Sequence, residues 1–284
     1  MQRDDPTSAA ILDSPALPSN PPGHGEQDRR ITILGVDVTD VTRPRAIEML
    51  DQVLRQPDGR THVVYFVNTH TLNLAAGNES FRQVLNLADC VFADGTGVRW
   101  AARLQGLRLR DNVNGTDLTP ELLRATAGHG YRYFLLGADE PTVTLAARHA
   151  ATSFDGWTQA GFHHGYLSDP QITARVIRQI NDARADLLLV GMGNPIQENW
   201  LHRHRRELNV PLCLAVGGLF TYWAGDLRRA PRWLRRCGAE WLGVLLQQPH
   251  KASRYLLGNP LFLVRICREW LARRGRSSTS PRAR

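Results

Sequence analysis

The amino-acid sequence predicts an α/β fold: a mainly parallel, Rossmann-like sheet with helices on both faces, plus a basic amphipathic helical C-terminal appendage. First, short β-branched apolar runs alternate with helix-length segments from Arg30 onward, which is the pattern of βαβ units. Second, apolar residues make up 42% of the 284 residues, with 24 glycines besides, which excludes a fibrous, coiled-coil or wholly disordered chain. Third, Arg, Trp and Leu residues are concentrated after position 227.

The same patterns divide the chain into four segments. Residues 1–28 contain five prolines and little apolar periodicity, which is typical of a disordered leader. Residues 29–227 hold the alternating pattern and are expected to form the α/β domain. Residues 228–274 are expected to form a helical appendage, and residues 275–284 a disordered basic tail.

The expected strands are runs of mostly β-branched, aliphatic and aromatic residues. In chain order they are Ile31–Val36, His62–Val67, Cys90–Ala93, Tyr131–Leu136, Ala185–Val190 and Pro211–Val216. Between them lie longer segments that are expected to be helices. These are Arg43–Arg55, Leu72–Ala88, Gly97–Leu104, Asp117–Ala127, Thr142–Phe154, Gln171–Ala183 and Ile196–Leu208.

Polar and glycine-rich residues follow five of the expected strands. They are Asn68-Thr69-His70-Thr71, Asp94-Gly95-Thr96-Gly97, Gly137-Ala138-Asp139, Gly191 to Glu198, and Gly217-Gly218. Ligands of parallel sheets bind at the carboxyl ends of the strands. The sequence therefore predicts a broad cleft along one edge of the sheet.

Asp94 is the first candidate for chemistry in this cleft. Its glycine neighbours permit close backbone approach to a ligand, and Thr96 can cap the helix that follows. A carboxylate there can act as a general base or orient a hydroxyl. The alternative is an Asp that only orders its own turn.

The loop Gly191-Met-Gly-Asn-Pro-Ile-Gln-Glu is the second candidate. It lacks the third glycine of the dinucleotide fingerprint, and Lys251, the single lysine of the chain, is not part of a Walker A motif. Gln197 and Glu198 follow Pro195 in the first helical turn, where they can bond a sugar or a base. Equally, they can complete a capping arrangement.

Several other chemistries find no signature in the sequence. The four cysteines are scattered without a CxxC pair, so a disulfide framework or a cysteine-based metal site is not expected. The histidine pairs His163-His164 and His202/His204 lack metal-ligand spacing supported by carboxylates. No GxSxG, HExxH or paired-carboxylate hydrolase motif is found.

The charge is strongly asymmetric along the chain. From Arg228 onward 14 basic side chains stand against two acidic ones, a net charge of +12, whereas residues 1–227 hold 21 basic and 25 acidic groups, a net charge of −4. Such asymmetry indicates an anionic partner, either a nucleic acid or a membrane surface. The apolar stretches Trp241–Leu246 and Tyr255–Cys267 are shorter than the roughly 20 residues that span a bilayer, and the acidic N-terminus is unlike a signal peptide. A soluble or peripheral protein is expected.

A series of motifs resembles the WecG/TagA/CpsF glycosyltransferase family. In order, these are Ala93-Asp94-Gly95-Thr96-Gly97, Asn114-Gly115-Thr116-Asp117, Gly193-Asn194-Pro195-Ile196-Gln197-Glu198-x-Trp200, Gly217-Gly218, Arg229-Ala230-Pro231 and Glu240-Trp241-Leu242. The resemblance covers about Ile31 to Arg268. It implies inverting, metal-independent transfer of a sugar from a UDP-sugar to an undecaprenyl-diphosphate-linked monosaccharide, in bacterial exopolysaccharide, cell-wall or surface-antigen synthesis.

The resemblance also implies partners and a location. Residues 29–227 would be the catalytic domain and residues 228–274 a membrane-docking helical appendage. A peripheral enzyme at the cytoplasmic face of the inner membrane is expected, with an anionic membrane surface as a partner, no nucleic acid and no cofactor, and a homo-oligomer is left open. The transferred sugar is left open between glucose, N-acetylmannosamine and its uronic acid. The loss of Arg at Asn112 and Val244 weakens the inference of an acidic donor, and Phe66 and Gln248 are further departures from the family pattern.

By the same resemblance, Asp94 matches the catalytic base and Asn68 an Asn beside the active site. The expected donor-binding residues, which combine the loop analysis with the family motif, are Thr96, Gly191, Gly193, Asn194, Gln197, Glu198, Gly217 and Gly218. The expected acceptor or membrane contacts are Asn112, Arg229, Arg232, Lys251 and Arg254. The alternative hypotheses are an α/β protein that binds nucleic acid through its basic segment and a Rossmann-type oxidoreductase, which the incomplete glycine fingerprint argues against.

Overall fold

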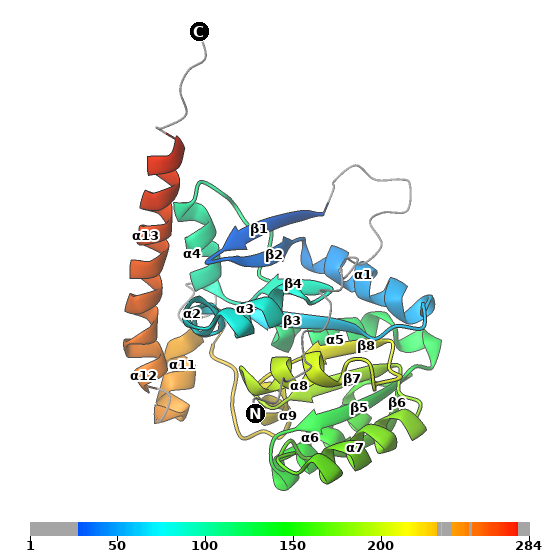
Figure 1. The fold of residues 1–284 in the computed structure, drawn as a ribbon. Helices are drawn as coiled ribbons and strands as arrows, with labels where there is room; N and C mark the ends of the chain where they lie inside the picture. The colour runs from blue at the N-terminus through cyan, green and yellow to red at the C-terminus, as the bar shows by residue number, and fades with distance from the viewer. Residues whose placement is uncertain (1–27, 232–233, 235–239, 250–251, 278–284) are drawn as a thin grey trace, which may run out of the picture.

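The computed structural model describes residues 28–231, 234, 240–249 and 252–277. Its centre is one eight-stranded sheet in the order β1-β2-β4-β3-β8-β7-β5-β6 (Figure 1). Every neighbouring pair is parallel except β1 and β2, which are antiparallel. The strands are β1 (Arg29–Ile33), β2 (Val36–Asp40), β3 (His62–Val67), β4 (Cys90–Ala93), β5 (Arg132–Gly137), β6 (Thr158–His163), β7 (Leu187–Gly191) and β8 (Leu212–Ala215).

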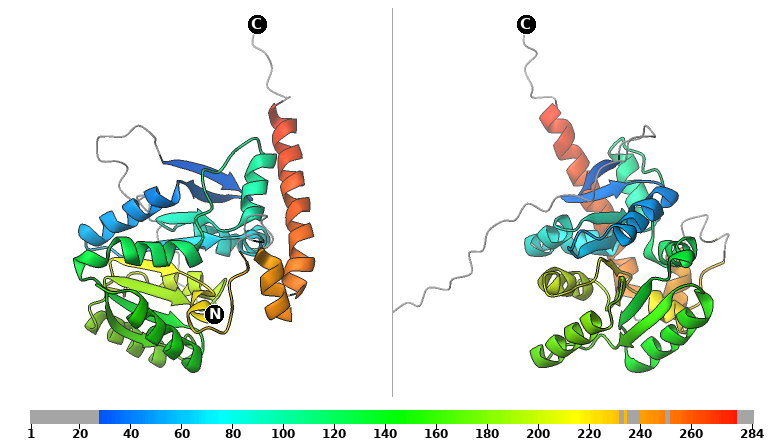
Figure 2. Two further views of the ribbon diagram at one scale, coloured as in Figure 1. Left: turned by 180° about the vertical axis from the view of Figure 1, so that it is seen from behind. Right: turned by 90° about the vertical axis from the view of Figure 1, so that its right-hand side faces the viewer.

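Helices cover both faces of the sheet, as the sequence predicts (Figure 2). The helices are α1 (Arg43–Arg55), α2 (Thr69–Gly77), α3 (Glu79–Asn86), α4 (Thr96–Leu104), α5 (Gly115–Ala125), α6 (Glu140–Ser153), α7 (Pro170–Asp182), α8 (Ile196–His204), α9 (Leu219–Trp223), α11 (Glu240–Gln247), α12 (Ala252–Leu256) and α13 (Gly258–Ser277), with a 3₁₀ turn at Ala127–His129. Residues of α2, α3, α4, α7, α8 and α13 share one core cluster, and residues of α1, α5, α6 and α9 share the other.

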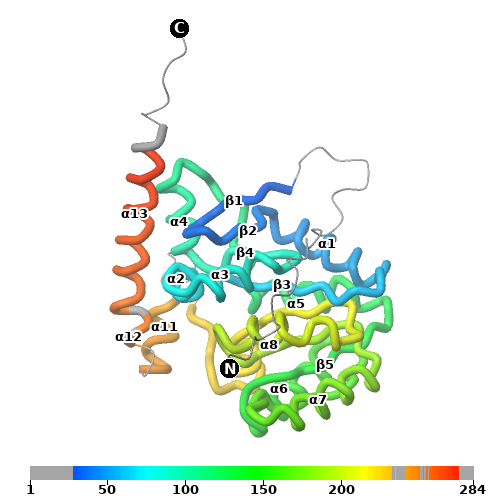
Figure 3. Tube along the Cα trace, in the orientation of Figure 1, coloured from blue at the N-terminus to red at the C-terminus, as the bar shows by residue number. Residues whose placement is uncertain are grey.

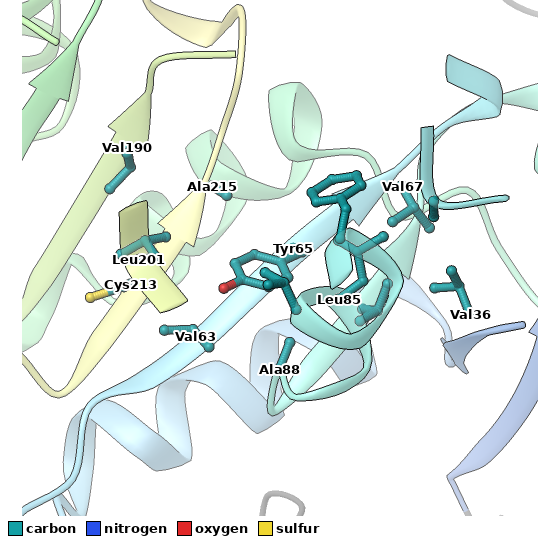
Figure 4. Close-up of a cluster of buried hydrophobic side chains, with 14 of the residues drawn as sticks. Val36, Val63, Tyr65, Val67, Leu85, Ala88, Val190, Leu201, Cys213 and Ala215 are labelled. Atoms are coloured by element: carbon teal, nitrogen blue, oxygen red, sulfur yellow. The ribbon is translucent and has the colours of Figure 1, made fainter. Parts of the chain in front are cut away.

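The two clusters follow the alternation of side chains along each strand. In β3, Val63, Tyr65 and Val67 belong to the first cluster, whereas Val64 and Phe66 belong to the second. Figure 4 shows part of the first cluster, where Tyr65 and Val63 lie between Leu85 and Cys213. All six residues of β3 are buried, which explains why parallel strands of this kind read as continuous apolar runs.

Two expected elements are wrong in extent. The segment Ile31–Val36 is not one strand, because Leu34 and Gly35 both have positive φ and turn the chain into the β1–β2 hairpin, the backbone of a type I′ turn. The segment Leu72–Ala88 is two helices, α2 and α3. Asn78 separates them, since its side chain accepts a hydrogen bond from the Phe81 N–H (3.0 Å) and caps α3.

One strand escapes sequence analysis altogether. The segment Thr158–His163 forms β6, the outer strand beside β5. Its residues TQAGFH are only partly buried, so the segment carries neither the apolar run of a central strand nor clean alternation. The other predicted strands and helices are confirmed, apart from shifts at their ends.

The segment after residue 227 contains helices, as predicted, and its last helix packs against the sheet domain. Figure 3 shows α13 running alongside α2 and α4, with which it is in contact. Phe262 and Ile266 of α13 are buried in the first core cluster. The Glu269 carboxylate accepts hydrogen bonds from the Leu34 N–H (3.2 Å) and from Gln105 (2.7 Å).

The order of the strands fixes where a ligand can bind. The first four strands lie on one side of the sheet and the last four on the other, and the two halves meet where β3 pairs with β8. The strand order therefore reverses between β3 and β8. In open parallel sheets the crevice for ligands opens outside the carboxyl ends of the strands at such a point.

Candidate active site

A cavity of about 1040 Å³ opens at this place. Residues at the ends of β3, β4 and β8, in the first turns of α4 and α5, in the loop before α8 and in α11, α12 and α13 line it. Ten of the predicted site residues are among them. They are Asn68, Asp94, Thr96, Asn112, Gly193, Asn194, Gln197, Gly217, Gly218 and Arg254. Gly191, Glu198 and Arg229 are not among the lining residues, and Arg232 and Lys251 fall outside the described residues.

The turn after β4 presents Asp94 to the cavity. The Asp94 N–H donates to the Val67 carbonyl (2.9 Å), which ties the end of β4 to the end of β3. Gly95 has a φ of +98°, and its N–H donates to the Asn112 Oδ1 (2.6 Å). A Cβ on Gly97 would lie 2.2 Å from Thr69 Cγ2, so any larger residue there would displace the Thr69 side chain. Asp94 itself is half-buried.

Two expectations about this turn need correction or refinement. Thr96 does not cap the helix, because it is the first residue of α4, and the cap residue is Gly95, with no side-chain hydrogen bond. Thr96 lines the cavity instead. Asn112 lines the cavity, and its side-chain oxygen also accepts from the Gly95 N–H. This hydrogen bond fixes the turn that follows Asp94.

Asn68 occupies the cap position of α2. Its Oδ1 accepts hydrogen bonds from the His70 N–H (3.0 Å) and the Thr71 N–H (3.2 Å), and Arg254 of α12 donates to the same oxygen (3.4 Å). This contact brings a cation from the C-terminal segment to the cavity wall. Burial and then the charge of Arg254 lower the pKa of His70 to about 4, so that imidazole is neutral at physiological pH.

A network of amides joins the loop before α8 to the end of β8. Gln197 is buried, and its Oε1 accepts from the Gly193 N–H (3.3 Å) and the Gly217 N–H (3.0 Å). Its Nε2 donates to Glu198 Oε1 (2.9 Å) and to the Ala215 carbonyl (3.3 Å). Gln197 thus holds both glycine turns, and it does not cap α8, which has no side-chain cap bond.

The glycines of this region differ in their surroundings. A Cβ on Gly191 would lie 2.8 Å from the Phe220 ring, so glycine is required there by the packing of α9. Gly193 has a φ of +81°, and a Cβ built on it meets no atom within 4 Å. Gly193 therefore presents bare backbone to the cavity.

Arg229 is engaged by α5. Its guanidinium makes an ion pair with Asp117 (2.6 Å) and lies over the Tyr222 ring at 5.5 Å. Asp117 also accepts from Asn114 Nδ2 (2.9 Å). The pair ties the segment after α9 to the first turn of α5, beside the cavity that Asp117 and Tyr222 line.

Sequence reasoning did not name several lining residues as site residues. From the body these are Phe66, Thr69, Trp100, Asn114, Thr116, Asp117 and Tyr222, and from the C-terminal segment Trp241, Val244, Asn259, Phe262 and Leu263. For Asn114 and Asp117 a signal existed, because N-x-x-D ahead of an apolar helix marks a helix start. Trp241 and Val244 lie in or just after the Glu240-Trp241-Leu242 motif. For Asn259, Phe262 and Leu263 no local signal exists, since their place depends on how the chain returns to the sheet.

The arrangement suits removal of a proton beside a charged leaving group. Among the described residues, Asp94 and Asp117 are the carboxylates that line the cavity, and Arg254 is the cation. Asp94 follows β4 directly, beside the glycine turn that precedes α4, where a carboxylate can act as a general base for a bound hydroxyl. The described residues contain no cluster of three metal-ligating side chains. No described helix is both long and apolar enough to cross a bilayer.

Comparison with known proteins identifies a family. The model of the Glycosyl transferase WecG/TagA/CpsF family matches residues 31–276. Similar proteins include the N-acetylglucosaminyldiphosphoundecaprenol N-acetyl-beta-D-mannosaminyltransferases of Staphylococcus aureus strains MW2 and COL. Each is 28% identical over 239 residues, which is 84% of this chain and 92% of the relative. The chain, with its α/β fold and its cavity at the β3–β8 junction, belongs to the WecG/TagA/CpsF family and is a glycosyltransferase.

Proposed function

We propose that this protein transfers N-acetylmannosamine from a UDP-linked donor to N-acetylglucosamine carried on undecaprenyl diphosphate, with inversion at the anomeric carbon and without a metal ion. The observation that carries the proposal is Asp94, which lines the cavity at the β3–β8 junction beside the glycine turn of α4. The sugar and the acceptor are those in the names of the similar staphylococcal enzymes.

In the proposed reaction Asp94 accepts the proton of an acceptor hydroxyl while that oxygen attacks the anomeric carbon. The new glycosidic C–O bond forms on one face of the sugar as the bond to UDP breaks on the other, which inverts the anomeric centre. UDP leaves with the bonding electron pair. The guanidinium of Arg254 supplies positive charge at the cavity wall for a diphosphate.

We also propose that the enzyme binds the anionic cytoplasmic surface of the inner membrane through exposed apolar side chains of its C-terminal helices. We call these side chains, which lie on and between α11, α12 and α13, the C-terminal apolar face: Leu242, Leu246, Leu256, Leu257, Leu261, Leu263, Val264 and Leu271. It belongs to a segment with a net charge of +12. Exposed leucines in a basic segment suit binding in the headgroup region of an anionic bilayer.

The mouth of the cavity supports a membrane-borne acceptor. Trp100 of α4 is 58% exposed and Leu263 of α13 is 46% exposed, and both line the cavity. Helices α4 and α13 are in contact. A diphosphate at the bilayer surface can therefore enter the cavity while its isoprenoid chain stays on the apolar side.

The transfer itself can be tested with a panel of donors. Purified protein is incubated with a short-chain polyprenyl-diphosphate N-acetylglucosamine acceptor and UDP-N-acetylmannosamine, its uronic acid, or UDP-glucose, with and without EDTA. We expect product from UDP-N-acetylmannosamine in the presence of EDTA, with a β linkage by NMR. Preference for another donor, loss of activity with EDTA, or an α linkage would each refute the corresponding part of the proposal.

A further inference from the structure

The first turn of α8 contains a carboxylate that is wholly buried. The Glu198 side chain is not among the groups that line the cavity. Its Oε1 accepts hydrogen bonds from Asn194 Nδ2 and Gln197 Nε2, and its Oε2 has no hydrogen-bond partner. No ion pair links it to a cation among the described residues. Burying a carboxylate without a cation beside it costs free energy of folding, so we expect Glu198 to have a function that accounts for its place.

The hydrogen bonds of the Gln197 amide indicate the role of Glu198. An amide side chain fits a site in two orientations that exchange its oxygen and nitrogen. Here both partners of Nε2, the Glu198 carboxylate and the Ala215 carbonyl, are acceptors. Both partners of Oε1, the N–H groups of Gly193 and Gly217, are donors. The reversed orientation would set oxygen against oxygen and N–H against N–H at all four contacts.

We propose that Glu198 is a positioning residue of the donor half of the active site: its carboxylate fixes the Asn194 and Gln197 amides, and Gln197 in turn fixes the glycine turns at Gly193 and Gly217. Asn194, Gln197 and both glycines line the cavity, whereas Glu198 lies behind them. The inference rests on the proposed function, because it needs a donor bound against these turns.

A consequence for donor recognition follows from the same bonds. The N–H groups of Gly193 and Gly217 donate to Gln197, so they are not directed at a bound phosphate. The two turns form a shaped backbone wall. We therefore expect donor binding to depend on the position of these two turns and not on hydrogen bonds from their N–H groups.

The protonation state of Glu198 offers a readout that a purely structural role would not move. Burial raises the pKa of Glu198 to about 7. Two other titratable groups lie near Glu198. Tyr65 of β3 donates to the Glu198 main-chain carbonyl (3.2 Å), and Cys213 of β8 lies in the same core cluster as Tyr65. Burial raises the pKa of both groups far above neutral, so neither titrates between pH 6 and 8. An ionised acceptor makes stronger hydrogen bonds than a neutral one, so the network is held most firmly above pH 7.

The test compares Glu198→Gln, Glu198→Leu and the control Glu140→Gln. Glu140 also lies in the first turn of a helix, α6, but it is exposed. We expect Glu198→Leu to raise the KM for UDP-N-acetylmannosamine by about tenfold or more, with a smaller change in kcat, since the Asn194 and Gln197 amides both lose the carboxylate that accepts from them. In the wild type the KM should rise as the pH falls from 8 to 6. In Glu198→Gln the KM should be raised a few-fold and be independent of pH.

The outcomes separate the inference from the proposed function. A wild type that neither binds nor uses any UDP-sugar refutes the proposed function, and the inference with it. If the wild type is active, the inference alone is wrong when Glu198→Gln keeps the wild-type KM and its pH profile, as Glu140→Gln should. Because Glu198→Gln preserves the size of the side chain, it decides the question even if Glu198→Leu does not fold.

Discussion

At the residue scale, the polar side chains around the cavity have two different roles. Asn68, Asn112 and Gln197 each use the side-chain oxygen to accept hydrogen bonds from backbone N–H groups in the turns or first helical turn that follow a strand. These side chains hold turns in place. Asp94 and Arg254 instead bring opposite charges to the cavity, where the proposed reaction requires a group that accepts a proton and a cation beside the leaving diphosphate. The supporting amides allow the charged groups to be set on loops without loss of position.

The first prediction concerns the bare backbone at Gly193. Gly193→Ala and Gly59→Ala place a methyl group at almost the same positive φ, +81° and +77°, and neither Cβ meets an atom within 4 Å. The backbone strain is thus matched, at roughly 1 kcal/mol or more, but Gly59 lies outside the cavity. We expect similar losses in Tm. Only Gly193→Ala should also reduce the thermal stabilisation by UDP-N-acetylmannosamine, and equal stabilisation of the two variants would remove Gly193 from the donor site.

At the element scale, the contacts of the C-terminal helices determine one wall of the cavity. Gln247 of α11 accepts from the Arg228 N–H (2.8 Å) and donates to the Arg228 carbonyl (3.0 Å), so α11 is attached to the segment that carries Arg229. Arg229 then binds Asp117 of α5. Through these bonds Trp241 and Val244 of α11 reach the cavity.

The second prediction tests this connection. Arg229→Gln should lower the rate of transfer by about tenfold or more, because α11 is no longer tied to α5. Its effect on stability should be small, since a partly exposed ion pair contributes on the order of 1 kcal/mol. Arg55→Gln is the control, since Arg55 makes an ion pair with Asp51 of α1 (2.7 Å) outside the cavity. Urea unfolding and transfer assays give both quantities. Equal transfer by the two variants would mean that the Arg229–Asp117 pair does not position α11.

The elements also show what the sequence can and cannot predict. The central strands are predictable, because a fully buried strand has a continuous run of apolar residues. The end of that run marks the end of the strand, so the polar residues after it are predictable too. The hairpin at Leu34-Gly35 is not predictable, since type I′ turns usually have Asn, Asp or Gly at the position where this chain has Leu34. Glu198 shares the loop motif with Gln197, but one residue on a helix turns its side chain by about 100°, here away from the cavity. Arg229 meets Asp117 through a long-range contact that no local pattern encodes.

At the scale of the whole molecule, α13 has some side chains that pack into the core and others that are exposed at the surface. Phe262 and Ile266 are buried, while Leu261, Val264 and Leu271 of the same helix are exposed. Removal of the segment after residue 227 would therefore uncover the core, and single substitutions on the C-terminal apolar face are the sharper probe of membrane binding.

The third prediction compares two exposed leucines. Leu257, between α12 and α13, is 71% exposed, and Leu145 on α6 is 43% exposed on a different part of the fold. Leu257→Ser should weaken binding to anionic liposomes by about threefold to tenfold, because less apolar surface enters the bilayer, whereas Leu145→Ser should have no effect. Co-sedimentation at several lipid charges and salt concentrations measures this. Binding that is the same for both variants would place the membrane contact elsewhere.

The central claim is that the carboxylate at the end of β4 removes the proton in sugar transfer, and single-turnover transfer by Asp94→Asn tests it most directly. Asp139→Asn is the control, because Asp139 also follows a parallel strand but caps α6 outside the cavity. We predict that Asp94→Asn keeps the Tm and the Kd for UDP-N-acetylmannosamine, and that it forms product about 10²–10⁴-fold more slowly than the wild type, while Asp139→Asn is unaffected. A folded Asp94→Asn protein that binds the donor and transfers the sugar at the wild-type rate would contradict the claim.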